Sequence, residues 1–391
     1  MPAYCDHNAT TPVDPRVREA MLPWLGERHG NPSSIHRWGR AAREAVEAAR
    51  DEVAALLGAR SGEIVFTASG TEANNTVLAT VARRAGFRGS IVVSALEHSS
   101  IRAGAAFLEA AGMRVTRVAP GGDGVVDPAA VAAALEDDTR LVALMRASNE
   151  IGTLQPVAEV AALCRERGVP LLCDAVQAVG KVPVDVGELG ADWATLGGHK
   201  FHGPPGVAAL WVRPEAALDP LLLGGGQERR RRASTENVAG VVGLGRAAAL
   251  AAAELPDRAR HLAALRDRFE AGAAALGARL HAVGSPRLPN TAHLAFDGVE
   301  GEALLIRLDL AGFAVSTGSA CASGAVEPSP TLLALGLPRQ EALGSIRVSF
   351  GMTNTAAEVE ALLAALEREV TALRRLAPGG GRAARAAGAG G

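Results

Sequence analysis

The sequence predicts an α/β fold with a large domain, whose mostly parallel sheet is covered by helices, and a smaller α+β domain at the C-terminal end. Strand-like apolar runs alternate with helical patterns to about residue 250, and this alternation is typical of parallel sheets. Around Pro256 the pattern changes to a long helix and then to short strands. A chain of 391 residues, 48% of them hydrophobic, is long enough to form two cores.

The large domain begins with a helix over residues 36–57, where apolar residues recur at helical spacing and a glycine follows as a stop signal. Short apolar runs predict strands at 64–67 and 91–94. Two further strand-like runs, 169–173 and 193–198, lack a regular polar face, as expected for strands buried on both sides.

The smaller domain is expected to contain a long helix near Pro256, strands near 291–296, 313–316 and 345–350, and a helix at 356–375. We place the large domain at residues 13–255 and assign residues 1–12 and 256–377 to the small domain. Residues 378–391 form a Gly/Ala/Arg tail that lacks the apolar residues of a core, so we expect them to be disordered.

Lys200 is the first candidate catalytic residue. It follows the strand at 193–198 and precedes a Gly/Pro-rich turn at 203–206, which would hold it beside His199. Desolvation there would favour the neutral amine, and a neutral amine can form a Schiff base. By itself the segment is equally compatible with a surface turn.

Asp174 ends the apolar strand that precedes Lys200. A carboxylate in that position faces the edge of a parallel sheet where ligands bind. Pyridoxal phosphate needs such an acid, because its ring accepts electrons only while the ring nitrogen stays protonated. Gln177 is placed to hydrogen-bond the ring hydroxyl. The competing interpretation is that Asp174 caps the next helix.

A candidate phosphate site follows the strand at 64–67, where small residues lead into a helix start and leave free backbone amides. Gly70 lets the backbone approach an anion, and Thr71 offers a hydroxyl. The same residues also read as an ordinary capping box, with Thr71 or Ser69 as the cap. His98, after the next strand, could stack on the ring or move a proton, or serve a structural role.

In this order along the chain, the motifs resemble those of the cysteine desulfurases, pyridoxal phosphate enzymes of the class V aminotransferase group, in the branch linked to nitrogen fixation and iron–sulfur cluster assembly. The resemblance runs nearly end to end. It rests on residues 4–12, 30–36, 149–152, 174–177, 199–200, 224–229 and 235–237. It implies the fold-type I architecture, with a seven-stranded type of sheet.

Cys321 is the residue that selects the reaction within this group. It lies among small residues at 316–324, which lack strand or helix periodicity and are similar to the active cysteine loop of that branch. Cys173, in contrast, has apolar neighbours. Without the resemblance, Cys321 could equally be an inert surface thiol.

The resemblance implies a site for the cofactor and one for L-cysteine. The cofactor residues are Gly70, Thr71, His98, Asn149, Asp174, Gln177, His199, Lys200 and Thr235, the last reaching the neighbouring subunit of a homodimer. The substrate residues are Asn149 and Arg347. The guanidinium of Arg347 matches a carboxylate in two hydrogen bonds, although a solvated strand position is the alternative for Arg347.

The implied catalytic residues are Lys200, His98 and Cys321. Lys200 would hold the cofactor and then remove the alpha proton, while His98 assists proton transfer. The Cys321 thiolate would attack the substrate sulfur, which leaves a persulfide and releases alanine. The sulfur would then pass to an acceptor or an iron–sulfur scaffold protein. No dedicated metal site is expected, apart from Cys321 as a transient iron–sulfur ligand.

Two positions depart from the family pattern. Relatives commonly have a serine that donates to the cofactor phosphate where this chain has Gly197. A glycine of the family is replaced by Arg230, within the run of arginines at 229–232. We expect weaker cofactor binding from the first change and an interface or active-site rim for the arginines.

The bulk composition excludes several other classes of function. The formal net charge of −2 and the absence of aromatic residues among the arginines argue against nucleic-acid binding. We expect no membrane segment, because the longest Ala/Leu run, 247–253, is too short to span a bilayer. Four cysteines without paired metal spacing suit a reducing cytosol, so a cytoplasmic location is expected.

Two alternatives remain open at the level of sequence. The first is a class V transaminase or a selenocysteine lyase-type enzyme that uses Lys200 without depending on Cys321. The second is a non-catalytic scaffold that kept the fold for binding a partner, which the change at Gly197 would permit.

Overall fold

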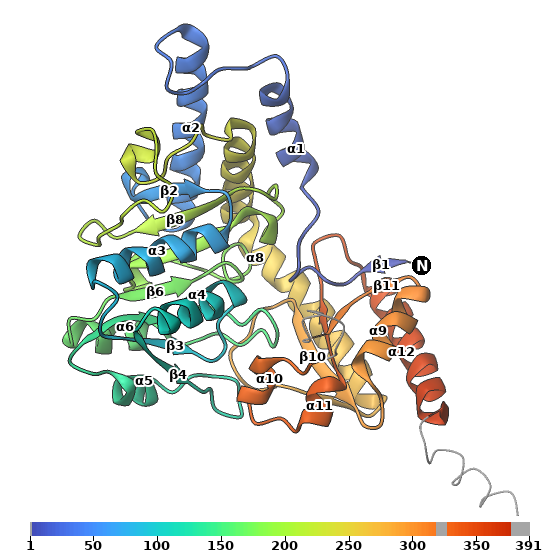
Figure 1. Cartoon of the computed structure of the whole chain (residues 1–391). Helices are drawn as coiled ribbons and strands as arrows, with labels where there is room; N and C mark the ends of the chain where they lie inside the picture. The colour runs from blue at the N-terminus through green and yellow to red at the C-terminus, as the bar shows by residue number, and fades with distance from the viewer. Residues whose placement is uncertain (1, 318–326, 377–391) are drawn as a thin grey trace, which may run out of the picture.

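The computed structural model describes residues 2–317 and 327–376 (Figure 1). Its largest element is a seven-stranded sheet with the order β2-β8-β7-β6-β5-β3-β4. Only β8 runs antiparallel to its neighbours, so the predicted mostly parallel sheet is confirmed. The strands are β2 (Ile64–Thr67), β3 (Ser90–Ser94), β4 (Arg114–Val118), β5 (Thr139–Ala143), β6 (Leu171–Asp174), β7 (Trp193–Gly197) and β8 (Ala208–Val212).

Helices cover both faces of this sheet (Figure 1). One face packs on α3 and α4 through a cluster that includes Val77, Ile91 and Leu108. The other face packs on α2, α6 and the first half of α8 through Val46, Val160 and Leu244. The helices of this domain are α1 (Pro15–Met21), α2 (Arg37–Leu56), α3 (Gly70–Arg84), α4 (Ser99–Ala110), α5 (Pro128–Ala134), α6 (Val157–Glu166) and α7 (Val186–Leu189), and short 3₁₀ turns lie at Leu22–Leu25, Ser61–Glu63, Gly198–Lys200 and Gln227–Arg230.

Helix α8 (Val238–Ala275) connects the two domains as one continuous helix through Pro256. Its first half packs in the core of the large domain, whereas Leu262 and Phe269 pack in the core of the small one. The boundary that we place at 255/256 therefore falls inside a helix. Among the described residues α8 alone is long and apolar enough to cross a membrane, but 56% of its most apolar window is buried, as in a core helix.

The small domain is built on a four-stranded sheet with the order β12-β13-β10-β9. Helix α9 packs against this sheet, and α12 packs against α9 and α8 (Figure 1). The elements are β9 (Ala278–Leu280), β10 (Thr291–Phe296), α9 (Gly301–Leu310), β11 (Phe313–Ala314), β12 (Ser316–Thr317), α10 (Pro330–Ala334), α11 (Arg339–Leu343), β13 (Ser345–Ser349) and α12 (Ala356–Leu376).

The N-terminal segment joins the small domain, beside which Figure 1 shows the N-terminus. Strand β1 (Ala3–Tyr4) pairs in parallel with β11, and Asp6 forms a further bridge to Ser349. The chain then continues to Thr11, whose backbone amide donates to the carbonyl of His199 in the large domain. These first residues therefore form a strap from the small sheet to the carboxyl edge of the large one.

The run of arginines adopts an uncommon backbone conformation. Glu228, Arg229 and Arg230 have φ values of +47°, +57° and +65°, in the left-handed region that favours glycine. Glu228 is held there by a buried ion pair with Arg50, at 2.7 Å. The backbone conformation thus gives a physical reason for the glycine that relatives have in place of Arg230.

Candidate active site

A cavity of about 450 Å³ opens at the carboxyl ends of the parallel strands, where ligands bind in open α/β sheets. The parallel strands β2, β3, β5, β6 and β7, or the segments that follow them, supply most of the lining, because parallel strands end at the same edge. Nine of the residues predicted from the sequence line this cavity: Gly70, Thr71, His98, Asn149, Asp174, Gln177, His199, Lys200 and Arg347.

Lys200 lies in the 3₁₀ turn that follows β7. Its Nζ donates hydrogen bonds to the carbonyl oxygens of Asn8 (2.6 Å) and Ala9 (2.8 Å) in the N-terminal strap. Burial and, to a smaller extent, the positive charge of Arg347 lower the pKa of Lys200 to about 8, with Asp6 and Asp174 acting in the opposite direction. The alternative of a free surface turn does not agree with this environment.

Asp174 is buried at the end of β6 and is held by two donors. Asn74 Nδ2 donates to one carboxylate oxygen at 2.8 Å, and the backbone amide of Val176 donates to the other at 3.0 Å. Asn74 Nδ2 also lies 3.0 Å from Ser100 Oγ. A carboxylate fixed in this way inside a cavity can hold the protonated nitrogen of a bound heterocycle.

His98 caps the N-terminus of α4, with Nδ1 accepting from the backbone amide of Ser100 at 3.2 Å. This contact favours the neutral tautomer with its proton on Nε2. Burial lowers the pKa of His98, so the ring is mostly neutral at pH 7. The neighbouring Glu97 is buried as well, and burial raises the pKa of its carboxyl to about 8.

The N-terminus of α3 forms the anion cradle that the sequence predicts. Ser69 is the cap: its hydroxyl accepts from the amide of Glu72 at 3.1 Å, and its carbonyl accepts from the amide of Ala73. Within the described residues no acceptor is recorded for the amides of Gly70 and Thr71, which leaves them for a ligand. A Cβ at Gly70 would lie 2.8 Å from a methyl group of Val176, so a larger residue would require that side chain to shift.

Arg347 is buried in β13, with a relative exposure of 6%, so the alternative of a solvated strand position is wrong. One nitrogen donates to the carbonyl oxygen of Asn149 at 2.9 Å, and another pairs with Asp6. Arg347 therefore brings a positive charge from the small domain into a cavity of the large one. A carboxylate ligand would share this guanidinium with Asp6, and the Nε of Arg347 has no hydrogen-bond partner among the described residues.

Sequence reasoning missed three polar residues of the site: Asn8 and Asn74 line the cavity, and Lys181 is buried behind Asn8 and Gln177. Asn8 accepts through its carbonyl from Gln177 Nε2 at 2.8 Å and through its side chain from Lys181 at 3.0 Å. Lys181 also donates to Gln177 Oε1 at 2.7 Å. Asn74 bridges Asp174 and Ser100, as described above. Of the three, only Asn8 could have been found from the sequence, because it is part of the motif at 4–12. Lys181 and Asn74 lie in helix-like segments, and no sequence pattern distinguishes them there.

Two predicted residues do not line this cavity. Thr235 is exposed and lines a separate, smaller cavity with Glu228 and Arg232. Cys321 lies outside the described residues. The segments on either side of it are both anchored next to the site: Ser316 in β12 is paired with Arg347, and Ser329 donates to the carboxylate of Glu150.

The lining residues fit the pyridoxal phosphate expected from the sequence. Lys200 supplies the amine, Asp174 the buried carboxylate, and the amides of Gly70 and Thr71 the anion cradle. The volume of the cavity suits a molecule of this size.

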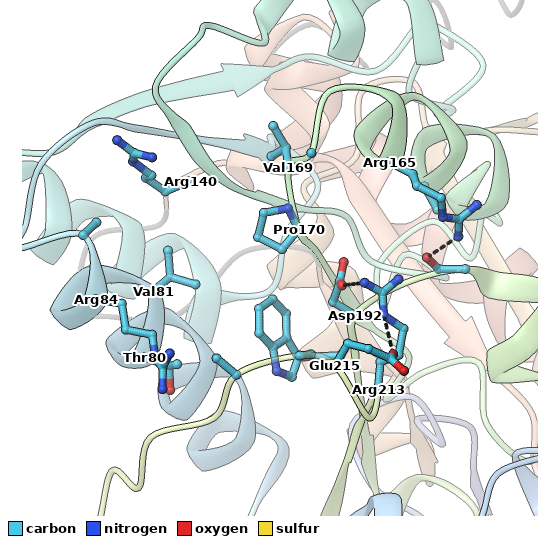
Figure 2. Close-up of a pocket in the computed structure, with 17 residues that line it drawn as sticks. Thr80, Val81, Arg84, Arg140, Arg165, Val169, Pro170, Asp192, Arg213 and Glu215 are labelled. Carbon is cyan, nitrogen blue, oxygen red and sulfur yellow. Dashed lines mark hydrogen bonds and ion pairs between the residues drawn. The ribbon is translucent and has the colours of Figure 1, made fainter.

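A second cavity, of about 640 Å³, lies at the opposite edge of the sheet (Figure 2). It is lined by residues that precede β6 and β7 and follow β8, such as Pro170, Asp192 and Arg213. Figure 2 shows Arg213 directed at Asp192 and Glu215, so its charge is already paired within the protein. This cavity has none of the predicted site residues.

The lowered pKa of Lys200 leads to a pH prediction. Attack of Lys200 on pyridoxal phosphate requires the neutral amine, so attachment to the cofactor-free protein should accelerate as pH rises, with a midpoint near 8 rather than near ~10.4. Stopped-flow absorbance at a series of pH values measures this. The Arg347→Met variant removes a positive charge that lowers the pKa of Lys200, so the midpoint of its pH–rate curve should move upward. A midpoint near ~10.4 in both proteins, the ordinary value for lysine, would contradict the assignment.

Comparisons with known proteins agree with this geometry. A model of the aminotransferase class-V family matches residues 3–362. The chain is 43% identical over 378 residues to the cysteine desulfurase IscS of Dictyoglomus turgidum, with 96% of each protein covered. A solved NifS-like protein superimposes with a TM-score of 0.90 at 37% identity, over 95% of this chain and 100% of that one. A structure described as SspA in complex with cysteine gives 0.80 at 31% identity, over 90% and 99%. The chain therefore belongs to the class-V aminotransferases, which depend on pyridoxal phosphate, and within them to the group of the cysteine desulfurases.

Proposed function

We propose that this protein converts L-cysteine to L-alanine and transfers the sulfur, as a persulfide on Cys321, to an acceptor protein. The observation that carries the proposal is the convergence of Lys200, Asp174 and the free amides of α3 on one cavity, which Arg347 enters from the small domain. The relatives named as cysteine desulfurases and the solved complex of SspA with cysteine support the same substrate.

Each residue of the cavity has its own role in the proposed reaction. Bound pyridoxal phosphate supplies an electron sink for the negative charge that develops at the alpha carbon. Lys200 holds the cofactor and, once released, accepts the alpha proton at Nζ. Asp174 keeps the ring nitrogen protonated. Arg347 and Asn149 orient the substrate carboxylate, and the neutral His98 relays a proton.

Cys321 performs the sulfur step. Its thiolate attacks the sulfur of L-cysteine, the new sulfur–sulfur bond forms as the carbon–sulfur bond breaks, and the carbon takes up a proton to become the methyl group of alanine. The products are alanine and a persulfide on Cys321, so no external oxidant or reductant is required. Transfer of that sulfur to an acceptor restores the thiol.

The surroundings of the other cysteines support the choice of Cys321. Cys5, Cys164 and Cys173 are buried, and burial raises their pKa values, to about 12 for Cys5 and for Cys164. A thiol with such a pKa is a poor nucleophile at neutral pH. Three residues lie between Cys321 and Thr317, the last residue of β12. Strand β12 pairs with β13, the strand that carries Arg347.

We further propose a homodimer with composite sites. Thr235, which reaches the neighbouring subunit in relatives, lies outside the cavity of its own chain. Leu25, Ile35 and Leu223 are exposed by 68%, 87% and 81%, as apolar side chains at an interface would be in an isolated subunit. We place the enzyme in the cytoplasm, and we propose an iron–sulfur scaffold protein as its sulfur acceptor.

The Gly197→Ser variant should bind pyridoxal phosphate more tightly. Gly197 has an extended backbone, and a Cβ there would lie 3.5 Å from Val176 and 3.6 Å from His199, which is ordinary contact. A hydroxyl bonded to a charged phosphate contributes about 1.5–3 kcal/mol, or roughly tenfold or more in affinity. Equilibrium dialysis of the cofactor-free protein measures the change. Gly197→Ala is the matched control, and equal affinity in the two variants would show that no hydroxyl contact forms.

The Cys321→Ser variant separates the desulfurase from the transaminase and scaffold alternatives. It should retain the cofactor absorbance and its response to L-cysteine, because Lys200 and Asp174 are unchanged, while release of alanine and sulfide collapses. The loss should fall on kcat more than on KM. Mass spectrometry of the unchanged enzyme should find one added sulfur on the peptide that contains Cys321. Normal alanine production by the variant, or the sulfur on another cysteine, would overturn the proposal.

Mixed dimers test the composite site. A dimer that combines Lys200→Ala with Thr235→Val has one complete site only if Thr235 acts across the interface, because Lys200 of one chain then meets Thr235 of the other. We expect about half of the unchanged activity from the purified mixed dimer at limiting cofactor. Activity no higher than that of the Thr235→Val homodimer, or a fully active monomer in light scattering, would exclude this arrangement.

A further inference from the structure

Lysine is almost absent from this protein. Of its 40 lysine and arginine residues, only Lys181 and Lys200 are lysines. Arginine serves at the other basic positions, including the exposed ones. Arginine cannot lose its proton at physiological pH, whereas a buried lysine can. The sequence therefore keeps an amine at two positions, and Lys200 accounts for one of them.

Lys181 is buried behind Asn8 and Gln177, which line the cavity, and its relative exposure is 4%. Its Nζ lies 2.7 Å from Gln177 Oε1 and 3.0 Å from Asn8 Oδ1. Gln177 and Lys181 are one turn apart in the helical segment after Asp174, which brings their side chains together. The site thus contains a second amine that the proposed chemistry does not use.

Nothing around Lys181 compensates a positive charge. Both of its acceptors are neutral amide oxygens, and within residues 2–317 and 327–376 it forms no ion pair. The charged groups that act on it most strongly, Lys200 and Arg347, have the same sign. The other titratable groups near it are the histidines His7, His199 and His202. Burial lowers the pKa of Lys181 well below its ordinary value, which favours the neutral amine. A neutral amine has two N–H groups, which match the two acceptors of Lys181.

We propose that Lys181 is a positioning residue, which fixes the side-chain amides of Gln177 and Asn8 in one orientation for cofactor binding. The proposal rests on the roles proposed above for Lys200 and Gln177.

Gln177 is the first group that Lys181 orients. Because Lys181 donates to Oε1, the Nε2 end of the amide points to the carbonyl of Asn8, to which it donates at 2.8 Å. The amide nitrogen has a second N–H, which remains for the ring oxygen of the cofactor. Without Lys181 the amide could flip and present its oxygen, which would repel an ionised ring oxygen.

Asn8 is the second. Its Oδ1 accepts from Lys181 and from Asn290 Nδ2, and its Nδ2 donates to Thr291 at 2.9 Å. Its backbone carbonyl accepts from Lys200 Nζ at 2.6 Å. Lys181 therefore supports the strap residue that holds the catalytic amine.

The charge of Lys181 can be measured without a variant. Lysine labelled with carbon-13 at Cε gives only two side-chain signals from this chain, and the chemical shift of Cε reports protonation of the attached amine. In the enzyme with its cofactor, the Lys181 signal should have the shift of a neutral amine at pH 7. If the Lys181 signal keeps the shift of a charged lysine up to pH 9, Lys181 is not a neutral donor, and the proposal is contradicted.

A double-mutant cycle tests the positioning role. Lys181→Met keeps the length of the side chain but removes both donors, and it should weaken binding of pyridoxal phosphate to the cofactor-free protein about tenfold. In a Gln177→Met background the same change should have less than about a twofold effect, since Lys181 then has no amide to orient there. If the fold-changes of the two single variants multiply in the double variant, the two residues act independently, and this would contradict the proposal. Unchanged cofactor affinity in Lys181→Met alone would also contradict it.

Controls separate this result from a loss of folding or of function. Circular dichroism and thermal unfolding verify that each cofactor-free variant is folded, and Arg88→Met, at an exposed position, should leave cofactor affinity unchanged. Cofactor binding is measured without L-cysteine. An enzyme that bound the cofactor as predicted but released no alanine would therefore overturn the proposed function and leave the role of Lys181 intact.

Discussion

The interaction on which the site depends is the set of hydrogen bonds made by Asn8. This residue of the N-terminal strap bonds to Ser349 and Thr291 of the small domain and to Gln177, Lys181 and Lys200 of the large one. The catalytic amine is thereby held by a segment distant from it in the chain. Since Asn8 is itself buried, each of these polar groups would be costly to leave unpaired, and the two domains are fixed together where the cavity needs both.

The electrostatics of the cavity suit anionic ligands. Lys200 and Arg347 contribute positive charge, the α3 amides add the positive end of a helix dipole, and Asp174 is the main carboxylate in the lining. Burial adds a second effect, because it shifts Lys200 toward its neutral form without removing it from the field of Arg347. One arrangement thus has the charges to attract a phosphate and a carboxylate and also contains an amine with a lowered pKa.

The departures from the family pattern affect binding and backbone conformation, leaving the groups that react in place. At Gly197, where the family pattern implies a serine, we expect one hydroxyl fewer for the cofactor phosphate, while the amides of Gly70 and Thr71 remain. Arg230 adopts a conformation that a glycine would occupy with less strain, beside the buried pair of Glu228 and Arg50. A protein kept only as a scaffold would have no need of a buried amine, a fixed carboxylate and an anion cradle in a single cavity.

The sequence by itself determined the α/β class, strands β2, β3, β6 and β7 of the large sheet and most of the cavity, because these follow from local patterns: apolar runs specify strands, and Asp174 and Lys200 stand at or shortly after the ends of two of them. Parallel strands end at one edge, so eight predicted residues meet there, and Arg347 joins them from the small domain. Only the tertiary structure decided the contributions that come from distant segments. The continuity of α8 through Pro256, the Asn8 strap and the buried amine of Lys181 depend on packing between elements far apart in the chain, and no local pattern encodes which buried polar groups will become partners.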